Sequence, residues 1–371
     1  MYNQQDLDDA VAAGAIDPAA AASLRNFLDA DRTAPAIDEE QFRLITGFND
    51  IFVSIASAIL LFAVGWIGQS IGQALGLTLG APGETGPTFL APAAVAATAW
   101  GLALFFTARR RMALPSILLL LAFVGGVFAT AVLSIGLVIG APYFEDNQSA
   151  VAIVAAVGAL IAAIGAYVHW QRFHVPVTVA AGAAAVVGLV LALIASALGE
   201  NAGEMRELML GAVLLLGVGV FLFAMRWDSS DQSRQTRRSD VAFWLHLLAA
   251  PMIVHPVFTL LGLNDGNATI GEGLVVVLLY VVLAIAALAI DRRALLVSAL
   301  AYVLYALTEL FKQIGAVELS VALTALVIGS ALLMLSAFWH QARRLVVSRL
   351  PSALQGKLPL LDRPLTLQPA A

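Results

Sequence analysis

The stretch that decides the fold is Ser239–Leu261, SDVAFWLHLLAAPMIVHPVFTLL. It is long and apolar enough to cross a bilayer as one helix, since about 20 apolar residues suffice. Yet it contains two of the five histidines of the chain, His246 and His255, and two prolines, Pro251 and Pro256. Ionisable side chains inside a membrane are costly and mark functional positions by default. The stretch is therefore predicted to be a spanning helix that carries a candidate site.

The composition extends this prediction to most of the chain. The 371 residues are 60% hydrophobic and only 12% charged, with a mean hydropathy of +0.89, whereas soluble domains carry about 25% charged residues. The sequence predicts an all-α fold, a polytopic transmembrane helix bundle of about ten spanning helices with both termini cytoplasmic and a small N-terminal helical hairpin. The predicted spans are 50–74, 88–108, 114–140, 149–170, 175–198, 207–226, 241–261, 272–290, 294–314 and 318–340.

The placement of arginine predicts the orientation of these helices. The loops 80–88, 141–149 and 263–273 contain no lysine or arginine. The connections that alternate with them are basic, and only Arg206 and Lys312 lie near the opposite side. Basic loops stay in the cytoplasm, so every second connection is predicted to be cytoplasmic. Scarce lysine beside abundant arginine and alanine suggests a GC-rich bacterial genome, so the predicted location is the bacterial inner membrane. The basic positions are Arg109, Arg110, Arg111, Arg172, Arg226, Arg234, Arg237, Arg238, Arg292, Arg293, Arg343, Arg344 and Arg349.

Three regions are predicted. Residues 1–48 form an acidic cytosolic hairpin, in which a first helix stops at Gly14 and a second begins after Asp17 with proline at its first position. Residues 49–340 form the ten-helix membrane domain, and residues 341–371 form a basic, proline-containing cytosolic tail lying on the lipid headgroups. Helices 1–4 and 7–10 of the membrane domain show weak similarities that suggest a parallel repeat, although the shared basic ends also follow from membrane orientation alone.

Small residues predict close helix packing at several places. Gly158, Ala162 and Ala166 recur at four-residue spacing, and the next helix is also rich in glycine and alanine. Such faces let two helix backbones approach closely. Gly217 and Gly219 are explained either as flexible points or as close-packing positions, and packing is the favoured interpretation.

The histidines of the seventh span, 241–261, are nine residues apart and lie on opposite faces, about 13 Å apart along the axis. They cannot share one metal ion on an unkinked helix. Pro251 and Pro256 each free a carbonyl and favour a bend that lines a cavity. The simpler interpretation is two satisfied histidines in a bent packing helix. His246 is near enough to the helix start to reach headgroups, so His255 is the stronger candidate.

The ninth span, 294–314, places four polar side chains within one sector of the helix. Glu309 and Lys312 are three residues apart and can pair. An interfacial ion pair is the simpler explanation, and a polar wall of a water-filled cleft, with Glu309 as a proton carrier, is the alternative. The four residues are Tyr302, Tyr305, Glu309 and Lys312.

Other polar residues are explained by helix starts. Caps that satisfy the first N–H groups account for Asp38, Asn49, Asp50 and Asp240. The chain has no cysteine, which excludes disulfides and thiolate chemistry. No HExxH, Walker A, GxSxG or dinucleotide pattern occurs, so an enzymatic function has no positive support. No metal, cofactor or nucleic-acid partner is expected; the expected partner is the lipid bilayer.

The N-terminal pattern of a short helix, Gly14-Ala15-Ile16, a second small-residue helix and then Asp38-Glu39-Glu40 before a multi-helix membrane region resembles an uncharacterised family of predicted bacterial multi-pass membrane proteins. That family is named only as a domain of unknown function. The resemblance covers about the first seventy residues, and it implies a bacterial cytoplasmic-membrane protein without an established substrate. The helix number alone is also similar to the drug/metabolite transporter superfamily, whose inverted five-plus-five duplication differs from the repeat suggested above.

Two functions remain open. One is a transporter or permease of an unidentified small molecule, with the seventh and ninth spans lining a cavity. The other is a non-transporting membrane scaffold or sensor whose N-terminal hairpin recruits a cytosolic protein. Convergence of His246, His255 and Glu309 on a water-filled cavity would favour the first, and local pairing of these residues in a solid bundle would favour the second.

Overall fold

The computed structural model describes residues 11–23, 48–80, 85–140, 142–145, 147–232, 234, 236–262, 269–313 and 318–361. The regular secondary structure in these ranges is entirely helical, which confirms the predicted all-α class. The chain divides into two compact units, Met1–Leu44 and Ile45–Ala371. Each unit is considered by itself.

The described part of the first unit shows the predicted turn between two helices. Gly14 has a positive φ of 71°, and its amide donates to the carbonyl of Val11 at 3.0 Å. The next helical turn begins at Pro18, directly after Asp17. Glycine and proline therefore end and start these helices as their backbone preferences require. The predicted cap at Asp38 lies outside the described residues.

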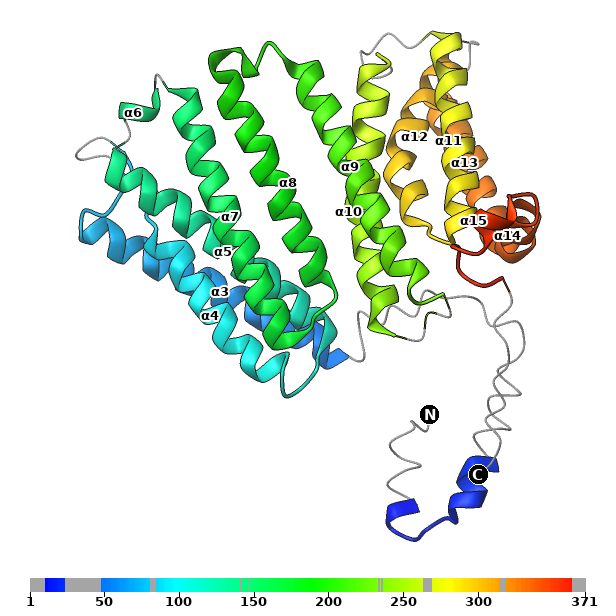
Figure 1. The fold of residues 1–371 in the computed structure, drawn as a ribbon, viewed down its shortest axis with the longest axis horizontal. Coiled ribbons are helices and arrows are strands. Elements are labelled where there is room, and N and C mark those ends of the chain that lie inside the picture. Colours follow the sequence, from blue (N-terminus) through cyan, green and yellow to red (C-terminus); the bar gives the residue numbers. More distant parts are fainter. Residues whose placement is uncertain are drawn as a thin grey trace. The chain divides into compact units, whose positions relative to one another are not determined.

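Ten apolar helices make up most of the second unit, and each falls on one predicted span (Figure 1). Nine of those described are long and apolar enough to cross a membrane. The tenth, α4, has only 17 residues and is about 25 Å long. The bounds are α3 Phe48–Ala74, α4 Leu90–Phe106, α5 Ala113–Ile139, α7 Gln148–Phe173, α8 Val177–Leu198, α9 Arg206–Ser229, α10 Arg237–Leu260, α11 Ile270–Ile290, α12 Ala294–Gln313 and α13 Ser320–Ala337.

Four short elements complete the described part of this unit. Two of them, α6 (Pro142–Glu145) and the 3-10 turn η1 (Gly199–Ala202), lie in connections between long helices. The other two, α14 (Trp339–Val347) and α15 (Ser352–Gln355), follow the last apolar helix. Most arginines of this unit lie in or beside the connections α4–α5, α7–α8, α9–α10 and α11–α12 or in the segment from α14 onward, and we call this side of the bundle the arginine end.

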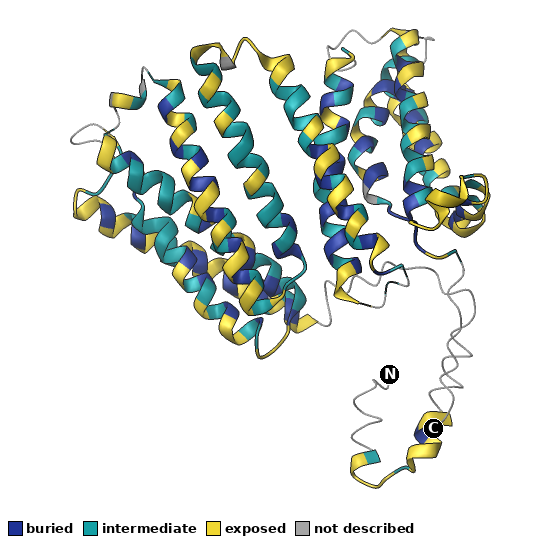
Figure 2. Cartoon of the chain, in the orientation of Figure 1, coloured by how far each residue is buried: buried dark blue, intermediate teal, exposed yellow. Residues whose placement is uncertain are grey.

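Helix α10 is the most buried of the long apolar helices. Half of its most apolar segment is buried, against 17–33% in the other eight. It contacts α8, α9 and α12, and Figure 1 shows it between α8 and the group α11 to α13. Large apolar side chains elsewhere are exposed, for example Phe62, Leu215 and Leu333, and exposed positions recur along the other long helices (Figure 2). Exposed apolar faces around buried contacts fit a multi-pass membrane protein.

Small residues bring the helix backbones together, as predicted for α7 and α8. This is the most extensive helix pair of the described part, and an added Cβ at Gly182 would lie 3.5 Å from the Cβ of Ala166. Gly158 instead faces α5, where an added Cβ would lie 2.6 Å from a methyl group of Val132. The small-residue face of α7 therefore serves two neighbours.

The C-terminal segment packs on the bundle as far as the structure describes it. Trp339, Val347 and Leu358 are buried in one apolar cluster with Leu288 and Ile290 of α11. This differs from the predicted tail that lies on lipid headgroups. Burial of three apolar side chains against α11 explains why the segment is held to the bundle.

Candidate functional site

Four buried polar residues meet at the arginine end where α9, α10 and the α11–α12 turn come together. They are Asp228, Ser239, His246 and Arg292, which we call the Asp228 cluster. The side chains of Asp228 and His246 are 0% exposed. A charge in such a place requires partners, because an unpaired buried charge costs several kcal/mol.

Asp228 accepts from two side chains at once. The Nε2 atom of His246 lies 3.0 Å from Oδ2. Arg292 donates from Nη2 to Oδ1 at 2.5 Å and from Nε to Oδ2 at 3.3 Å. This two-pronged contact is the geometry that arginine and carboxylate prefer. The Arg292 guanidinium also donates to the carbonyl and hydroxyl oxygens of Ser239, at 3.1 and 3.3 Å. The cluster therefore ties three helices together.

The imidazole of His246 is held on one side only. A carboxylate accepts hydrogen bonds and does not donate, so Nε2 carries the proton that it shares with Asp228. The other nitrogen, Nδ1, is buried without a hydrogen-bond partner among the described residues. The ring meets Phe221 edge-on, with centroids 5.2 Å apart. His246 is thus oriented by Asp228 and by an aromatic neighbour.

The turn between α11 and α12 explains how Arg292 points inward. Asp291 ends α11 in the left-handed region, with φ of 57°, a conformation that aspartate adopts more readily than most residues. The amide of Arg292 then donates back to the carbonyl of Ala287 at 2.9 Å, the bond typical of a tight helix C-terminus. Two consecutive side chains are therefore directed into the protein by one turn.

Asp291 organises a second group, the Asp291 cluster, with Arg234, Trp339 and Arg343. Arg234 donates from Nη1 to Oδ2 at 2.8 Å, and the indole N–H of Trp339 donates to Oδ1 at 2.7 Å. Arg343 lies farther away, with Nε 3.6 Å from Oδ1. Arg234 also donates to the carbonyls of Ile290 and Asp291, which places positive charge at the C-terminal end of α11, where the helix dipole favours it.

The second cluster reaches the C-terminal segment. Arg343 donates to the carbonyls of Pro359 and Leu360, at 2.7 and 3.1 Å. Gln232 donates to the carbonyl of Gly356 at 2.6 Å. Polar contacts therefore extend from the buried Asp291 cluster to residues 356–360, where the Gln232 contact is exposed.

His255 occupies a different environment from His246. Its Nδ1 lies 2.5 Å from the hydroxyl of Tyr302 on α12, and the side chain of His255 is exposed. His246 does not reach the headgroups, because its side chain is wholly buried. His255, the stronger candidate from the sequence, has only the Tyr302 hydroxyl as its side-chain partner among the described residues. Helix α10 continues through both prolines, Pro251 exposed and Pro256 buried.

On α12 the structure shows the expected pairing of Glu309 with Lys312, whereas Tyr302 contacts His255. Lys312 donates to Glu309 at 2.7 Å, with side chains 43% and 25% exposed, and Tyr305 is 37% exposed. His246, His255 and Glu309 each have a separate local partner. One pocket is lined by residues of α7 to α9 and another by residues of α11 to α14, and none of the three residues lines either pocket. No group of three or more potential metal ligands occurs among the described residues.

The predicted helix caps are displaced by a few residues. α3 begins at Phe48, so Asn49 lies inside its first turn beside the buried Asp50. The cap of α10 is Thr236, whose hydroxyl oxygen accepts from the amide of Arg238 at 3.2 Å. Asp240 lies in the first turn of α10, where its charge still suits the positive end of the helix dipole.

Sequence reasoning missed the two aspartates of these clusters and explained their arginines by membrane orientation alone. The signal that was available is the position of Asp228 and Asp291, each just after an apolar span and close to arginines of its own connection. Comparison with protein-family models, with curated proteins and with solved structures finds no match. The function is therefore argued from the geometry.

Proposed function

We propose that this chain is a membrane scaffold or sensor of the bacterial inner membrane, with its arginine end in the cytoplasm and its C-terminal segment coupled to the helix bundle. The observation that carries the proposal is a pair of polar clusters joined through consecutive residues. His246 and Arg292 bind Asp228, and the adjoining Asp291 pairs with Arg343, which donates to the carbonyls of Pro359 and Leu360. Coupling between distant sites needs such a contiguous network with two arrangements.

The adjacency of Asp291 and Arg292 makes the coupling direct. Any movement of α9 against α10 shifts the carboxylate of Asp228 and pulls on Arg292. The turn that carries Arg292 also carries Asp291, to which Trp339 donates. Buried ion pairs resist partial separation, because a charge left without its partner costs several kcal/mol. The network therefore favours a joint movement of α9, α10 and the turn with Asp291 and Arg292 over a movement of one of them alone.

The acidic N-terminal unit is the proposed partner-binding element, as the resemblance to a family with this hairpin suggests. Its described helical turn, Pro18–Ser23, presents mostly exposed residues. The C-terminal segment would then regulate or report the state of the bundle on the same side of the membrane. In this proposal the N-terminal unit and the C-terminal segment both act on the cytoplasmic side of the membrane.

A permease is the second candidate, and one observation favours it. The face of α12 that carries Tyr305 and Lys312 is exposed at the surface of a predicted spanning helix. Polar residues in such a position need water, lipid headgroups or another protein surface. Proton flux into dye-loaded proteoliposomes, lost in Glu309→Gln, would support the permease over the sensor.

The coupling can be measured in this chain because it contains no cysteine. Leu358→Cys places one thiol at a buried position of the C-terminal segment. We expect His246→Leu and Asp228→Asn to accelerate its labelling by a water-soluble maleimide, since both loosen the network that holds the segment. His255→Leu is the matched control, because this histidine bonds Tyr302 and lies outside the network.

Labelling rates are compared well below the melting temperature of each variant, so that global unfolding does not contribute. Equal labelling rates in Leu358→Cys alone and in its combinations with His246→Leu, Asp228→Asn and His255→Leu would overturn the proposed coupling. Faster labelling in His255→Leu alone would point to α12 instead and would also contradict it.

A further inference from the structure

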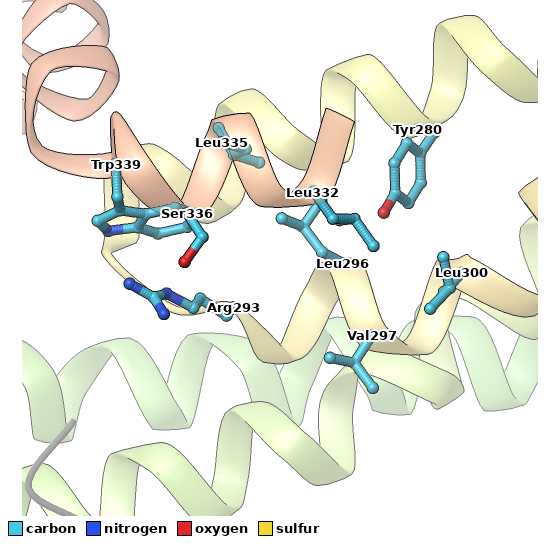
Figure 3. A pocket seen from close by; sticks show the side chains of 9 residues that line it. All are labelled: Tyr280, Arg293, Leu296, Val297, Leu300, Leu332, Leu335, Ser336 and Trp339. Atoms are coloured by element: carbon cyan, nitrogen blue, oxygen red, sulfur yellow. The ribbon is translucent and has the colours of Figure 1, made fainter. Parts of the chain in front are cut away.

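A groove between α12 and α13 ends at Arg293, which has no ion-pair partner among the described residues. Its volume is about 180 Å³, and its lining residues are Tyr280, Arg293, Leu296, Val297, Leu300, Leu332, Leu335, Ser336 and Trp339 (Figure 3). We call it the Arg293 groove. Most of the lining is aliphatic, and the polar groups gather near its ends.

The guanidinium of Arg293 lies over the ring of Trp339, with its central carbon 4.8 Å from the ring centroid. It makes no ion pair or hydrogen bond to any described residue, unlike Arg292 beside it, which is bound to Asp228. Stacking on an aromatic ring fixes an arginine in place while leaving its N–H groups free to bind an anion. Figure 3 shows the guanidinium, the Ser336 hydroxyl and the Trp339 ring at the same end of the groove.

The other end of the groove is apolar apart from one phenol. Leu296 and Leu332 lie between the two ends, and the hydroxyl of Tyr280 points into the space (Figure 3). This hydroxyl is buried without a hydrogen-bond partner among the described residues. The groove thus offers a positive polar end and an apolar floor, the two features of a site for an amphiphile with an anionic head.

Size and position indicate a lipid and not a water-soluble ligand. Sites that enclose a small molecule usually measure about 300–1,000 Å³, so this groove holds only part of a ligand and leaves the rest outside. The arginine end is the membrane face where basic pockets between helices bind lipid headgroups, and tryptophan is typical of that depth. An acyl chain that continues into the bilayer satisfies these constraints.

From this geometry we infer that the Arg293 groove binds an anionic phospholipid, with the headgroup phosphate at Arg293 and Ser336 and one acyl chain between α12 and α13. The site is separate from the proposed coupling network, although Trp339 belongs to both. Arg293 stacks on one face of the indole, whereas the indole N–H is directed to Asp291.

The test measures the thermal stability of the purified full-length chain in mild detergent during titration with dioleoylphosphatidylglycerol, dioleoylphosphatidylcholine or inorganic phosphate. We expect phosphatidylglycerol to raise the melting temperature saturably, phosphatidylcholine to do so more weakly, and inorganic phosphate to have no effect. Arg293→Gln should weaken the apparent affinity for phosphatidylglycerol about fivefold, the factor for one juxtamembrane arginine. Arg293→Lys should keep most of the preference.

Two further variants distinguish the contribution of the lipid headgroup from that of the acyl chain. Arg238→Gln removes an exposed arginine of α10 at the same membrane face and should leave the titration unchanged. Leu332→Trp fills the groove without changing its charge and should weaken both lipids. An unaltered phosphatidylglycerol titration in Arg293→Gln, or a stability gain from inorganic phosphate alone, would overturn the lipid site. Equal loss in Arg238→Gln would reduce it to general attraction to a basic surface.

Discussion

Nε2 of His246 lies 3.0 Å from Oδ2 of Asp228, although the two residues are 18 positions apart and belong to different helices. The same carboxylate is bound by Arg292, 64 positions away. Three segments that are distant in sequence therefore meet on one buried aspartate. We therefore expect the loss of that single carboxylate to destabilise this end of the bundle more than the loss of an exposed ion pair.

The first prediction is that Asp228→Asn destabilises the chain severely. The variant keeps the shape of the side chain but leaves the buried Arg292 without its counter-charge, which costs about 3–5 kcal/mol. Thermal or denaturant unfolding in detergent measures the loss. Replacing both residues, as in Asp228→Leu with Arg292→Met, should recover part of it, because no uncompensated charge remains.

Glu309→Gln is the control for this experiment. It breaks the Glu309–Lys312 pair, which is partly exposed, and such pairs contribute about 0–1 kcal/mol. Similarly small losses of stability in Asp228→Asn and Glu309→Gln would show that the buried carboxylate of Asp228 contributes no more than an exposed ion pair.

The second prediction ranks the two histidines of α10. His246→Leu removes a buried hydrogen bond to a charged group, worth about 1.5–3 kcal/mol. His255→Leu replaces an exposed side chain whose one partner is the Tyr302 hydroxyl, so its cost should be smaller. The free energy of unfolding of the two variants, measured side by side, decides the order. A larger loss in His255→Leu would restore the ranking that the sequence suggested.

The different environments of His246 and His255 show what the sequence can and cannot predict. Hydropathy locates the helices, since apolar length depends on local sequence alone, and each predicted span falls on a helix. The predicted end of the sixth span was 226, but α9 continues to Ser229. These three residues include Asp228, which contacts His246. Because the span was predicted to end before Asp228, the sequence did not indicate the contact between Asp228 and His246.

The arginines illustrate a second limit. One rule, that basic residues remain on the cytoplasmic side, accounts for the arginines of the basic connections without any side-chain partner. Arg292 and Arg293 are therefore equivalent in sequence. In the structure Arg292 is bound to Asp228, whereas Arg293 stacks on Trp339. Only the left-handed turn at Asp291 and the tertiary contacts of α14 distinguish them.

The third prediction concerns the contact between α9 and α10. A Cβ added at Gly217 would lie 2.8 Å from the Cβ of Met252 and 3.1 Å from its carbonyl oxygen. We expect Gly217→Val to force the two helices apart and to lower stability by about 1–3 kcal/mol, as overpacking does. Gly219→Val is the matched control, because nothing lies within 4 Å of its Cβ position. If the two variants melt alike, close packing at Gly217 is refuted.

The fourth prediction concerns orientation. Reporter fusions at Asp231 and Gly356 should be active as cytoplasmic reporters, and fusions at Gly83, Asn147 and Asn267 should report the outer side, because the basic connections determine the inward face. Alkaline phosphatase and a cytoplasmic fluorescent protein provide opposite readouts for each site. A cytoplasmic result at Asn147 would contradict both the ten-span topology and the placement of the arginine end.

The fifth prediction separates the two roles of Trp339, whose N–H binds Asp291 and whose ring supports Arg293. Trp339→Phe removes the N–H donor but keeps an aromatic face. It should therefore speed maleimide labelling of Leu358→Cys while leaving the phosphatidylglycerol titration nearly unchanged. Trp339→Leu removes both and should change both readouts. Parallel changes of the two readouts in Trp339→Phe would mean that the Asp291 cluster and the Arg293 groove are one unit, because losing the hydrogen bond alone would then be enough to displace the arginine from its ring.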